Sequence, residues 1–193
     1  MEFNSDYWEN RYLEETTRWD LGTVSPPIKE YIDQLENKEL RIAIPGGGNS
    51  YEAEYLFKND FTNVSVIDIA ASPLENIQHR IPGFPKDRLI QEDFFNLDMT
   101  FDLVIEQTFF CALHPNLRSA YAKKIHSLLA TEGKIVGLLF DAPLYEDHPP
   151  FGGNKKEYQK LFTPYFDIEI METATNSIES RAGRELFIKM LKK

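Results

Sequence analysis

Short apolar runs alternate with amphipathic stretches along most of this chain of 193 residues. The runs are rich in β-branched residues, which favour strands, whereas the stretches between them repeat their apolar positions at helical spacing. The pattern predicts strands at 40–44, 63–69, 88–91, 101–107, 133–140, 166–174 and 184–193. It predicts helices at 5–16, 26–38, 49–58, 72–79, 115–129 and 154–162.

The order of these elements indicates the fold class. Strand and helix alternate five times, which is typical of a parallel sheet covered by helices on both faces. The last two strands follow one another without a helix and predict an antiparallel addition. We therefore expect an α/β, Rossmann-like sheet of seven strands, six parallel and one reversed. We expect one domain over 1–193, with N-terminal helices in 1–38 and the sheet in 39–193.

The charge of the chain narrows the class of partner. Asp and Glu number 31 against 21 Lys and Arg, a net charge of −10, which repels nucleic-acid backbones and anionic lipid. We expect a small-molecule partner, no nucleic acid and no membrane, and a monomer or weak homo-oligomer. The single cysteine, Cys111, excludes an internal disulfide, and the N-terminus lacks signal-peptide features. A cytoplasmic location is expected.

Candidate chemistry begins where the first strand ends, at Pro45-Gly46-Gly47-Gly48. Ligands of open parallel sheets bind beyond the carboxyl ends of the strands, and glycine allows a sharp turn and close approach. Asp68 ends the second strand, 22 residues after Gly46, a spacing at which a carboxylate can accept from both ribose hydroxyls. A tight turn and a surface or capping carboxylate, with Ser72 an equally good cap, are the structural alternatives. Together the two features favour an adenosine-containing ligand.

The glycine pattern also distinguishes between adenosine ligands. A dinucleotide site requires a third glycine where this chain has Tyr51, whose ring would crowd a pyrophosphate. S-adenosylmethionine has no phosphate and is the cofactor we expect. Asp93, after the third strand, can accept from the adenine amine, and Phe94 can lie along the adenine face. A helix N-cap is an equally reasonable role for Asp93.

Several longer stretches resemble a known family. They are YWENRYLEETTRWDLGTVSPPI (7–28), IPGGG (44–48), FDLVIEQTFFCALHPNLRSAYA (101–122), HPPFG (148–152) and NSIESRAGRE (176–185). On these residues the chain resembles the thiopurine S-methyltransferase family of class I methyltransferases, in particular its bacterial members and the plant halide/thiol methyltransferases. The resemblance runs over nearly the whole chain.

The resemblance implies a site. The N-terminal segment is expected to fold over the cofactor as a lid whose aromatic walls attract the sulfonium through cation–π contact. The implied cofactor residues are Trp8, Tyr12 and Trp19 as walls, Gly46 and Gly48 at the methionine part, Asp68 at the ribose, Asp93 and Phe94 at the adenine, and Gln107 under the reactive sulfur. The chain departs from the pattern at Gln107, where mammalian thiopurine enzymes have arginine and plant-like members tyrosine. Because glutamine neither carries charge nor titrates, this argues against thiopurine activity and against a base at Gln107.

We therefore expect S-adenosylmethionine-dependent methyl transfer to a small soft nucleophile: a thiol, sulfide, halide or metalloid. An oxygen or nitrogen acceptor, or a non-catalytic cofactor binder, is the alternative. A thiol must first lose its proton. Polar candidates for this step are Asp141, Tyr145 and His148, and Gln107 is a further candidate catalytic residue that does not act as a base. Candidate pocket walls are Phe109, Phe110, Phe140, Tyr145 and Phe151.

Each of these residues has an ordinary structural alternative. His148 is more readily explained as an exposed loop histidine, and Phe109 and Phe110 equally well as core residues. Cys111 is expected to be a small buried hydrophobe. Arg181 and Arg184 are expected to pair with acidic neighbours rather than face an anionic substrate. No metal-ligand spacing is present.

Overall fold

The sheet of the computed structural model, which describes residues 3–193, has seven strands. They are β1 (Ile42–Pro45), β2 (Val64–Asp68), β3 (Leu89–Gln91), β4 (Phe101–Gln107), β5 (Leu129–Phe140), β6 (Phe166–Thr173) and β7 (Glu185–Lys192), in the order β3-β2-β1-β4-β5-β7-β6. β7 runs antiparallel to β5 and β6, and the other pairs are parallel. The predicted sheet with one reversed strand is confirmed.

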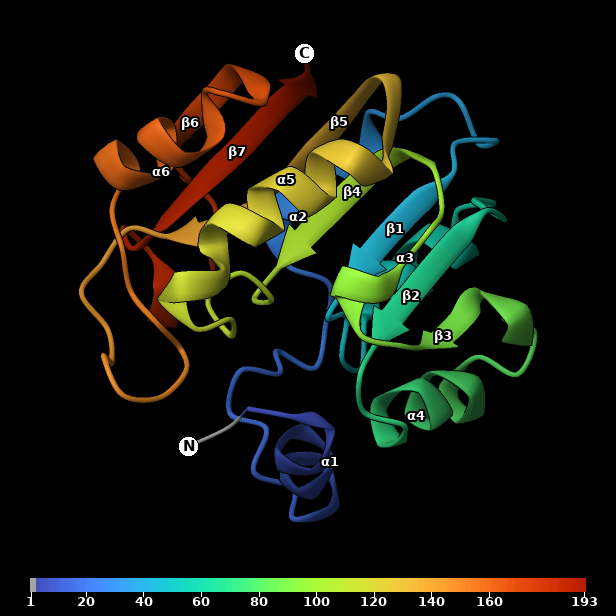
Figure 1. Ribbon diagram of the computed structural model, residues 1–193. Coiled ribbons are helices and arrows are strands. Elements are labelled where there is room, and N and C mark those ends of the chain that lie inside the picture. Colours follow the sequence, from blue (N-terminus) through green and yellow to red (C-terminus); the bar gives the residue numbers. More distant parts are fainter. Residues whose placement is uncertain (1–2) are drawn as a thin grey trace.

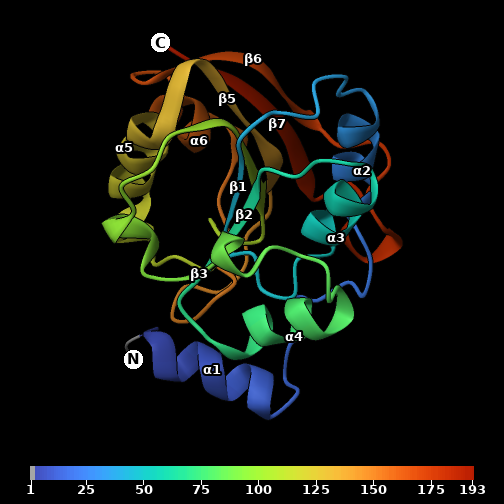
Figure 2. The same ribbon diagram turned by 90° about the vertical axis from the view of Figure 1, so that its right-hand side faces the viewer.

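Helices cover both faces of this sheet (Figures 1 and 2). The helices are α1 (Ser5–Leu13), α2 (Pro26–Asp33), α3 (Tyr51–Lys58), α4 (Ser72–Arg80), α5 (Arg118–Leu128) and α6 (Lys155–Phe162). α5 and α6 pack on one face around Tyr121 and Phe162, and α2 and α3 pack on the other around Ile28 and Leu56. Within residues 3–193, no helix combines the length and apolarity that crossing a bilayer requires.

Several predicted boundaries are wrong, and at four of them the backbone turns earlier or later than the apolar pattern suggests. α1 ends at Leu13 rather than residue 16, since Glu15 has a φ of 54°. α2 ends at Asp33 rather than at residue 38, because the chain forms a short turn directly after Asp33. The predicted helix at 115–129 starts as a 3₁₀ turn, and β5 begins at Leu129, bending around Glu132 (φ 61°).

The strand order reverses between β1 and β4, which is where ligands bind in open α/β sheets. The carboxyl ends of β1, β2 and β4 carry the glycine turn, Asp68 and Gln107 to this edge. In Figures 1 and 2, α1 lies across the same edge of the sheet, beside α4. The fold therefore brings the N-terminal segment (residues 3–24) over the predicted site.

Candidate cofactor and acceptor site

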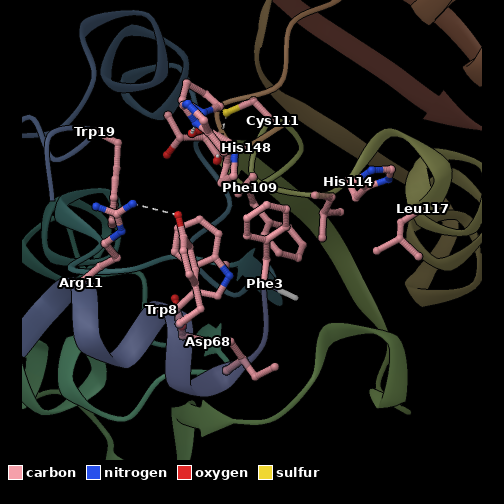
Figure 3. A pocket seen from close by; sticks show the side chains of 18 of the residues that line it. Phe3, Trp8, Arg11, Trp19, Asp68, Phe109, Cys111, His114, Leu117 and His148 are labelled. Atoms are coloured by element: carbon pink, nitrogen blue, oxygen red, sulfur yellow. Dashed lines mark hydrogen bonds between the residues drawn. The ribbon is translucent and has the colours of Figure 1, made fainter. Parts of the chain in front are cut away.

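A cavity of about 1240 Å³ lies beyond the carboxyl ends of the strands. Its walls come from the N-terminal segment, the ends of β2, β3 and β4, the loop after β5 and residues 180–184 (Figure 3). Pockets that bind one drug-sized ligand measure roughly 300–1,000 Å³. The cavity therefore has room for a nucleoside-sized ligand and a small acceptor together.

The glycine turn is shaped by the protein's own aromatic rings. Gly46 and Gly48 have φ values of +55° and +54°, which favour glycine over other residues. A Cβ on Gly46 would lie 2.0 Å from Cδ2 of Phe109, and one on Gly48 would lie 2.5 Å from the Tyr12 hydroxyl oxygen. The missing side chains thus make room for Phe109 and Tyr12, whereas the sequence predicted close approach of a ligand or a tight turn.

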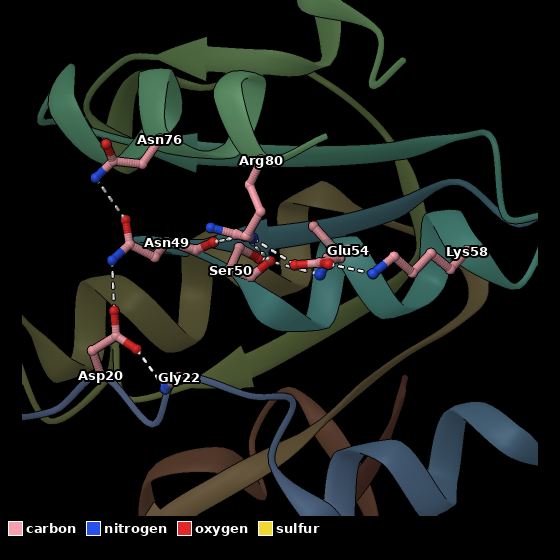
Figure 4. Close-up of polar contacts among 9 residues, drawn as sticks. Asp20, Gly22, Asn49, Ser50, Glu54, Lys58, Asn76 and Arg80 are labelled. Carbon is pink, nitrogen blue, oxygen red and sulfur yellow. Dashed lines mark hydrogen bonds and ion pairs between the residues drawn. The ribbon is translucent and has the colours of Figure 1, made fainter. Parts of the chain in front are cut away.

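Polar contacts hold the outer side of this turn (Figure 4). The Asn49 side chain donates to Asp20 of the N-terminal segment at 2.5 Å, and Arg80 donates to the Asn49 and Ser50 carbonyls. Ser50 caps α3 by accepting from the Ala53 amide at 3.4 Å, and the Arg80 guanidinium lies 4.4 Å from the centre of the Tyr51 ring. The first turn of α3 is therefore capped and covered from within the protein, where a dinucleotide pyrophosphate would need free amides.

Asp68 lies in the wall of the cavity and is 7% exposed. Its two oxygens accept from the backbone amides of Gly48 and Ala70, each at 2.9 Å. Burial raises the pKa of this carboxyl to about 6, against the opposing effect of these hydrogen bonds. Because a carboxylate has about four acceptor sites, two remain for the hydroxyls of a ribose. The residues present fit the predicted cofactor at this point.

The N-terminal segment is pinned to α4 by a carboxylate that the sequence did not reveal. Glu9 on α1 accepts from the backbone amides of Ala71 (2.8 Å) and Ser72 (3.1 Å) and from the Ser72 hydroxyl. It thereby caps α4, the role considered for Asp68 and Ser72. Ser5 adds a bond from its hydroxyl to the Ile69 carbonyl at 2.9 Å.

The aromatic residues predicted for the lid meet at the cavity. Trp8 and Trp19 pack edge to face with ring centres 5.6 Å apart, and Tyr12 and Trp19 are 5.9 Å apart. All three line the cavity. Burial, together with the nearby Asp68 carboxylate, raises the pKa of Tyr12 far above its usual value, so its hydroxyl stays protonated.

The predicted adenine residues are also in the cavity wall. Asp93 accepts from the Phe95 amide at 2.9 Å and so caps a 3₁₀ turn, as the structural alternative supposed. Phe94 is 4% exposed and packs edge to face on Phe109, with ring centres 5.3 Å apart.

The predicted acceptor residues divide into two groups. Phe109, Phe140, Tyr145 and His148 line the cavity. Phe110 does not, because it points into the core against Tyr121 and Tyr158, and Phe151 lies behind Phe3. Asp141 is also outside the wall, where it accepts from the Lys155 amide at 3.0 Å.

Gln107 lies in a different place from the large cavity. It faces a small cavity of about 40 Å³ between the glycine turn and residues 19–23. Its side-chain oxygen is buried and has no hydrogen-bond partner within the described residues. Such an atom can accept from a ligand or a water that enters this space.

Basic side chains gather around the large cavity. Its lining includes Arg11, Arg18, Arg181 and Arg184. Arg181 pairs with Glu185 at 3.3 Å, both side chains at least nine-tenths buried, and donates to the Trp19 carbonyl at 2.8 Å. Pairing with an acidic neighbour, as predicted, is confirmed for Arg181. Arg184 is exposed and takes part in no ion pair among residues 3–193.

Cys111 also contributes to the wall, and burial raises the pKa of its thiol to about 12. The thiol donates a hydrogen bond to the Thr108 carbonyl oxygen, which lies 3.2 Å from the sulfur. It is therefore a protonated, buried side chain. In the part of the chain that the structure describes, no group of three His, Cys, Asp or Glu side chains is placed to hold a metal.

Sequence reasoning missed Glu106, which is fully buried at the end of β4. One oxygen accepts from the backbone amides of Phe109 and Phe110, each at 2.8 Å, and the other accepts from the Tyr121 hydroxyl at 2.5 Å. Burial raises the pKa of this carboxyl to about 7 despite the three bonds. The sequence did contain a signal for Glu106. That residue lies two residues after Val104 on the same strand, so its side chain is on the same face of the sheet, and Val104 points into the core.

The raised pKa of Glu106 predicts that stability falls as pH rises from 5 to 8. At a pH between the usual pKa of a glutamate and about 7, Glu106 is protonated in the folded state and ionised in the unfolded state. The bound proton stabilises the folded state, and this stabilisation is lost as the pH rises through about 7. We expect a loss of roughly 2 kcal/mol relative to Glu106→Gln, whose side chain does not titrate. Urea unfolding of both proteins at the two pH values measures the difference. Parallel pH profiles for the two proteins would contradict it.

Comparisons with known proteins show the family and the fold of the chain. The model of the family thiopurine S-methyltransferase (TPMT) matches residues 3–191. A probable thiol methyltransferase 2 of Arabidopsis thaliana is 29% identical over 168 residues, covering 84% of this chain and 74% of its own. Thiocyanate methyltransferase 1 of the same plant is 28% identical over 184 residues, covering 92% and 81%.

A solved structure shares the fold. It is the 1,6-didemethyltoxoflavin-N1-methyltransferase of Burkholderia thailandensis with bound 1,6-didemethyltoxoflavin and S-adenosylhomocysteine, with a TM-score of 0.79 and 15% identity over 98% of this chain and 87% of that one. The family model matches nearly the whole chain and therefore shows the family to which it belongs. The chain belongs to the thiopurine S-methyltransferase family and is an S-adenosylmethionine-dependent methyltransferase.

Proposed function

We propose that the methyl acceptor is a small soft nucleophile: a thiol, sulfide, halide or metalloid. The observation that carries this proposal is the distribution of charge around the cavity. The acidic side chains of its wall are Asp68, Glu92 and Asp93, at the ends of β2 and β3, whereas the other walls combine aromatic rings with four arginines. A wall of aromatic rings and arginines suits a weakly hydrated anion, because such an anion loses little hydration energy when it enters the cavity. The thiol and thiocyanate activities named for the two plant relatives support the same class.

The cofactor is proposed to lie along the part of the cavity wall that contains Asp68. Its ribose meets Asp68, its adenine lies between Asp93 and Phe94, and its methionine part follows the glycine turn at Gly46 and Gly48. Trp8, Tyr12 and Trp19 close over the sulfonium, and Gln107 supplies its unpaired side-chain oxygen from below the turn. The pairing capacity left on Asp68 and the aromatic cover support this placement.

The chemistry asks little of the protein beyond placement. S-adenosylmethionine, when bound, supplies a methyl group on an already activated sulfonium. The side chains of this cavity therefore orient the acceptor and exclude water, which strengthens every electrostatic contact inside. Phe109 and Phe140 provide dry walls, and Arg184 attracts an anionic acceptor into the cavity.

The first experiment is methyl transfer to a panel of hydrosulfide, iodide, thiocyanate, alkyl and aryl thiols and a thiopurine, with products identified by mass spectrometry. We expect methylated thiol, sulfide or halide and no methylated thiopurine. Oxygen- and nitrogen-bearing acceptors serve as controls. Binding of S-adenosylhomocysteine without transfer to any soft acceptor would overturn the proposal and leave the cofactor site intact.

The aromatic cover predicts the effect of Trp19→Ala. The ring lines the cavity from a half-buried position, so its loss should leave the melting temperature nearly unchanged. Affinity for S-adenosylmethionine should fall by about 0.5–2 kcal/mol, the range of cation–π contacts. Affinity for S-adenosylhomocysteine, which has no sulfonium charge, should fall less. Calorimetric titration of both ligands tests this, and a collapse of the melting temperature would assign Trp19 to the core instead.

We also propose that the protein acts in the cytoplasm as a monomer or weak homo-oligomer without nucleic acid. Support comes from the net charge of −10 and from a single, buried cysteine. Light scattering after size-exclusion chromatography measures the oligomeric state, and a stable large assembly would contradict it.

A further inference from the structure

Two histidines line the cavity, His148 half-buried and His114 exposed. Nδ1 of His148 lies 2.8 Å from the Pro149 carbonyl oxygen. A carbonyl oxygen only accepts, so Nδ1 must donate, and a neutral ring then carries its lone pair on Nε2. Nδ1 of His114 lies 2.8 Å from the side-chain oxygen of Asn116 and 3.3 Å from its backbone nitrogen, so both contacts are to one exposed neighbour.

His148 has an aromatic neighbour and an acidic neighbour. Its ring stacks on Tyr145 with centres 4.0 Å apart, and Nε2 lies 3.8 Å from a carboxylate oxygen of the exposed Asp147. The charged side chains of the other walls are Arg11, Arg18, Arg181 and Arg184, with Asp68, Glu92 and Asp93. Figure 3 shows His148 and Asp68 at opposite ends of the cavity.

Five other polar side chains in or near the site are unsuitable as bases. Asp141 lies outside the wall, and the Cys111 thiol is held protonated by burial. Glu106 is sealed in the core, and Gln107 does not titrate. Asp68 is committed to two backbone amides at the far end. Histidine is the side chain that exchanges a proton most readily near neutral pH.

We propose that His148 is the general base for acceptors that arrive as neutral thiols, an inference that rests on the proposed function. The thiol S–H bond breaks, and its proton passes to Nε2 of His148. A lone pair of the thiolate sulfur then forms the bond to the methyl carbon. The bond between that carbon and the sulfonium breaks, and its electron pair stays on the departing sulfur. The products are a methyl thioether, S-adenosylhomocysteine and an imidazolium, which returns its proton to water. Thiocyanate and iodide need no base.

The test compares acceptors of different acidity in His148→Asn. Asparagine places its amide nitrogen near the position of Nδ1 and can keep the bond to the Pro149 carbonyl, but it lacks Nε2. An alkyl thiol is only a few per cent thiolate at neutral pH, so kcat/KM for it should fall about 30-fold. The kcat/KM for thiocyanate and iodide should stay within about threefold of the value for the parent protein, because these acceptors have no proton to lose.

His114→Gln is the matched control, because it alters the other histidine of the same wall. Any effect it has should be equal for all acceptors. An equal loss for thiols and anions in His148→Asn, or no loss for thiols, would overturn the proposal. Failure of the parent protein to methylate any soft acceptor would instead refute the proposed function, and the two failures are therefore distinguishable.

Discussion

Glu106→Ala is expected to lower the free energy of unfolding by about 3–5 kcal/mol, the range found when a buried polar network loses its central partner. The substitution leaves three donors without an acceptor: the amides of Phe109 and Phe110 and the Tyr121 hydroxyl. Each unsatisfied buried group costs about 1–3 kcal/mol, and the cavity left by the side chain adds to this. Urea unfolding at pH 7 measures the loss.

Two further variants separate the hydrogen bonds from the charge. Glu106→Gln keeps the oxygen that accepts from both amides, and the Tyr121 hydroxyl can turn to accept from its NH₂ group, so this variant should stay folded. Tyr121→Phe removes one donor only and should cost about 1 kcal/mol. If Glu106→Ala is as stable as Glu106→Gln, the three contacts do not hold the turn.

The second large effect is on the cofactor. Asp68→Ala should weaken binding of S-adenosylhomocysteine by about 1.5–3 kcal/mol for each ribose hydrogen bond lost, at least a tenfold change in the dissociation constant. The effect should be large because the carboxylate is 7% exposed and also orders the turn through the Gly48 amide. Isothermal titration calorimetry gives the affinity directly.

Asp98→Ala is a suitable control for the change in net charge, because Asp98 is exposed and outside the cavity wall. Asp68→Asn preserves the size of the side chain and should recover part of the affinity, since one oxygen still accepts. Unchanged affinity in Asp68→Ala would show that the ribose lies elsewhere. The melting temperature of each variant shows whether the glycine turn has stayed folded.

The sheet could be predicted because its strands are short apolar runs with clear spacing, as in Val64–Asp68, where every residue is buried. Helix ends were harder, because a single left-handed residue such as Glu15 stops a helix that the apolar pattern would continue. The residues at the carboxyl ends of β1 and β2 could be assigned to a site because parallel strands bring those ends together.

Contacts between distant segments could not be predicted from the sequence. Phe110 and Phe109 are adjacent and chemically identical, yet the turn held by Glu106 sends one into the core and the other over Gly46. Glu9 and Ser72 are 63 positions apart, and no local pattern links a helix cap to a donor at that separation. The fold decides such pairings.

The capping of α4 by Glu9 also provides a built-in reporter. The Ala71 and Ser72 amides donate to Glu9 rather than to a carbonyl of their own helix, and they are protected only while α1 lies against α4. Their deuterium uptake therefore records how often the N-terminal segment lifts away. A ligand that holds the segment closed would slow exchange at these two amides, even though it touches neither of them.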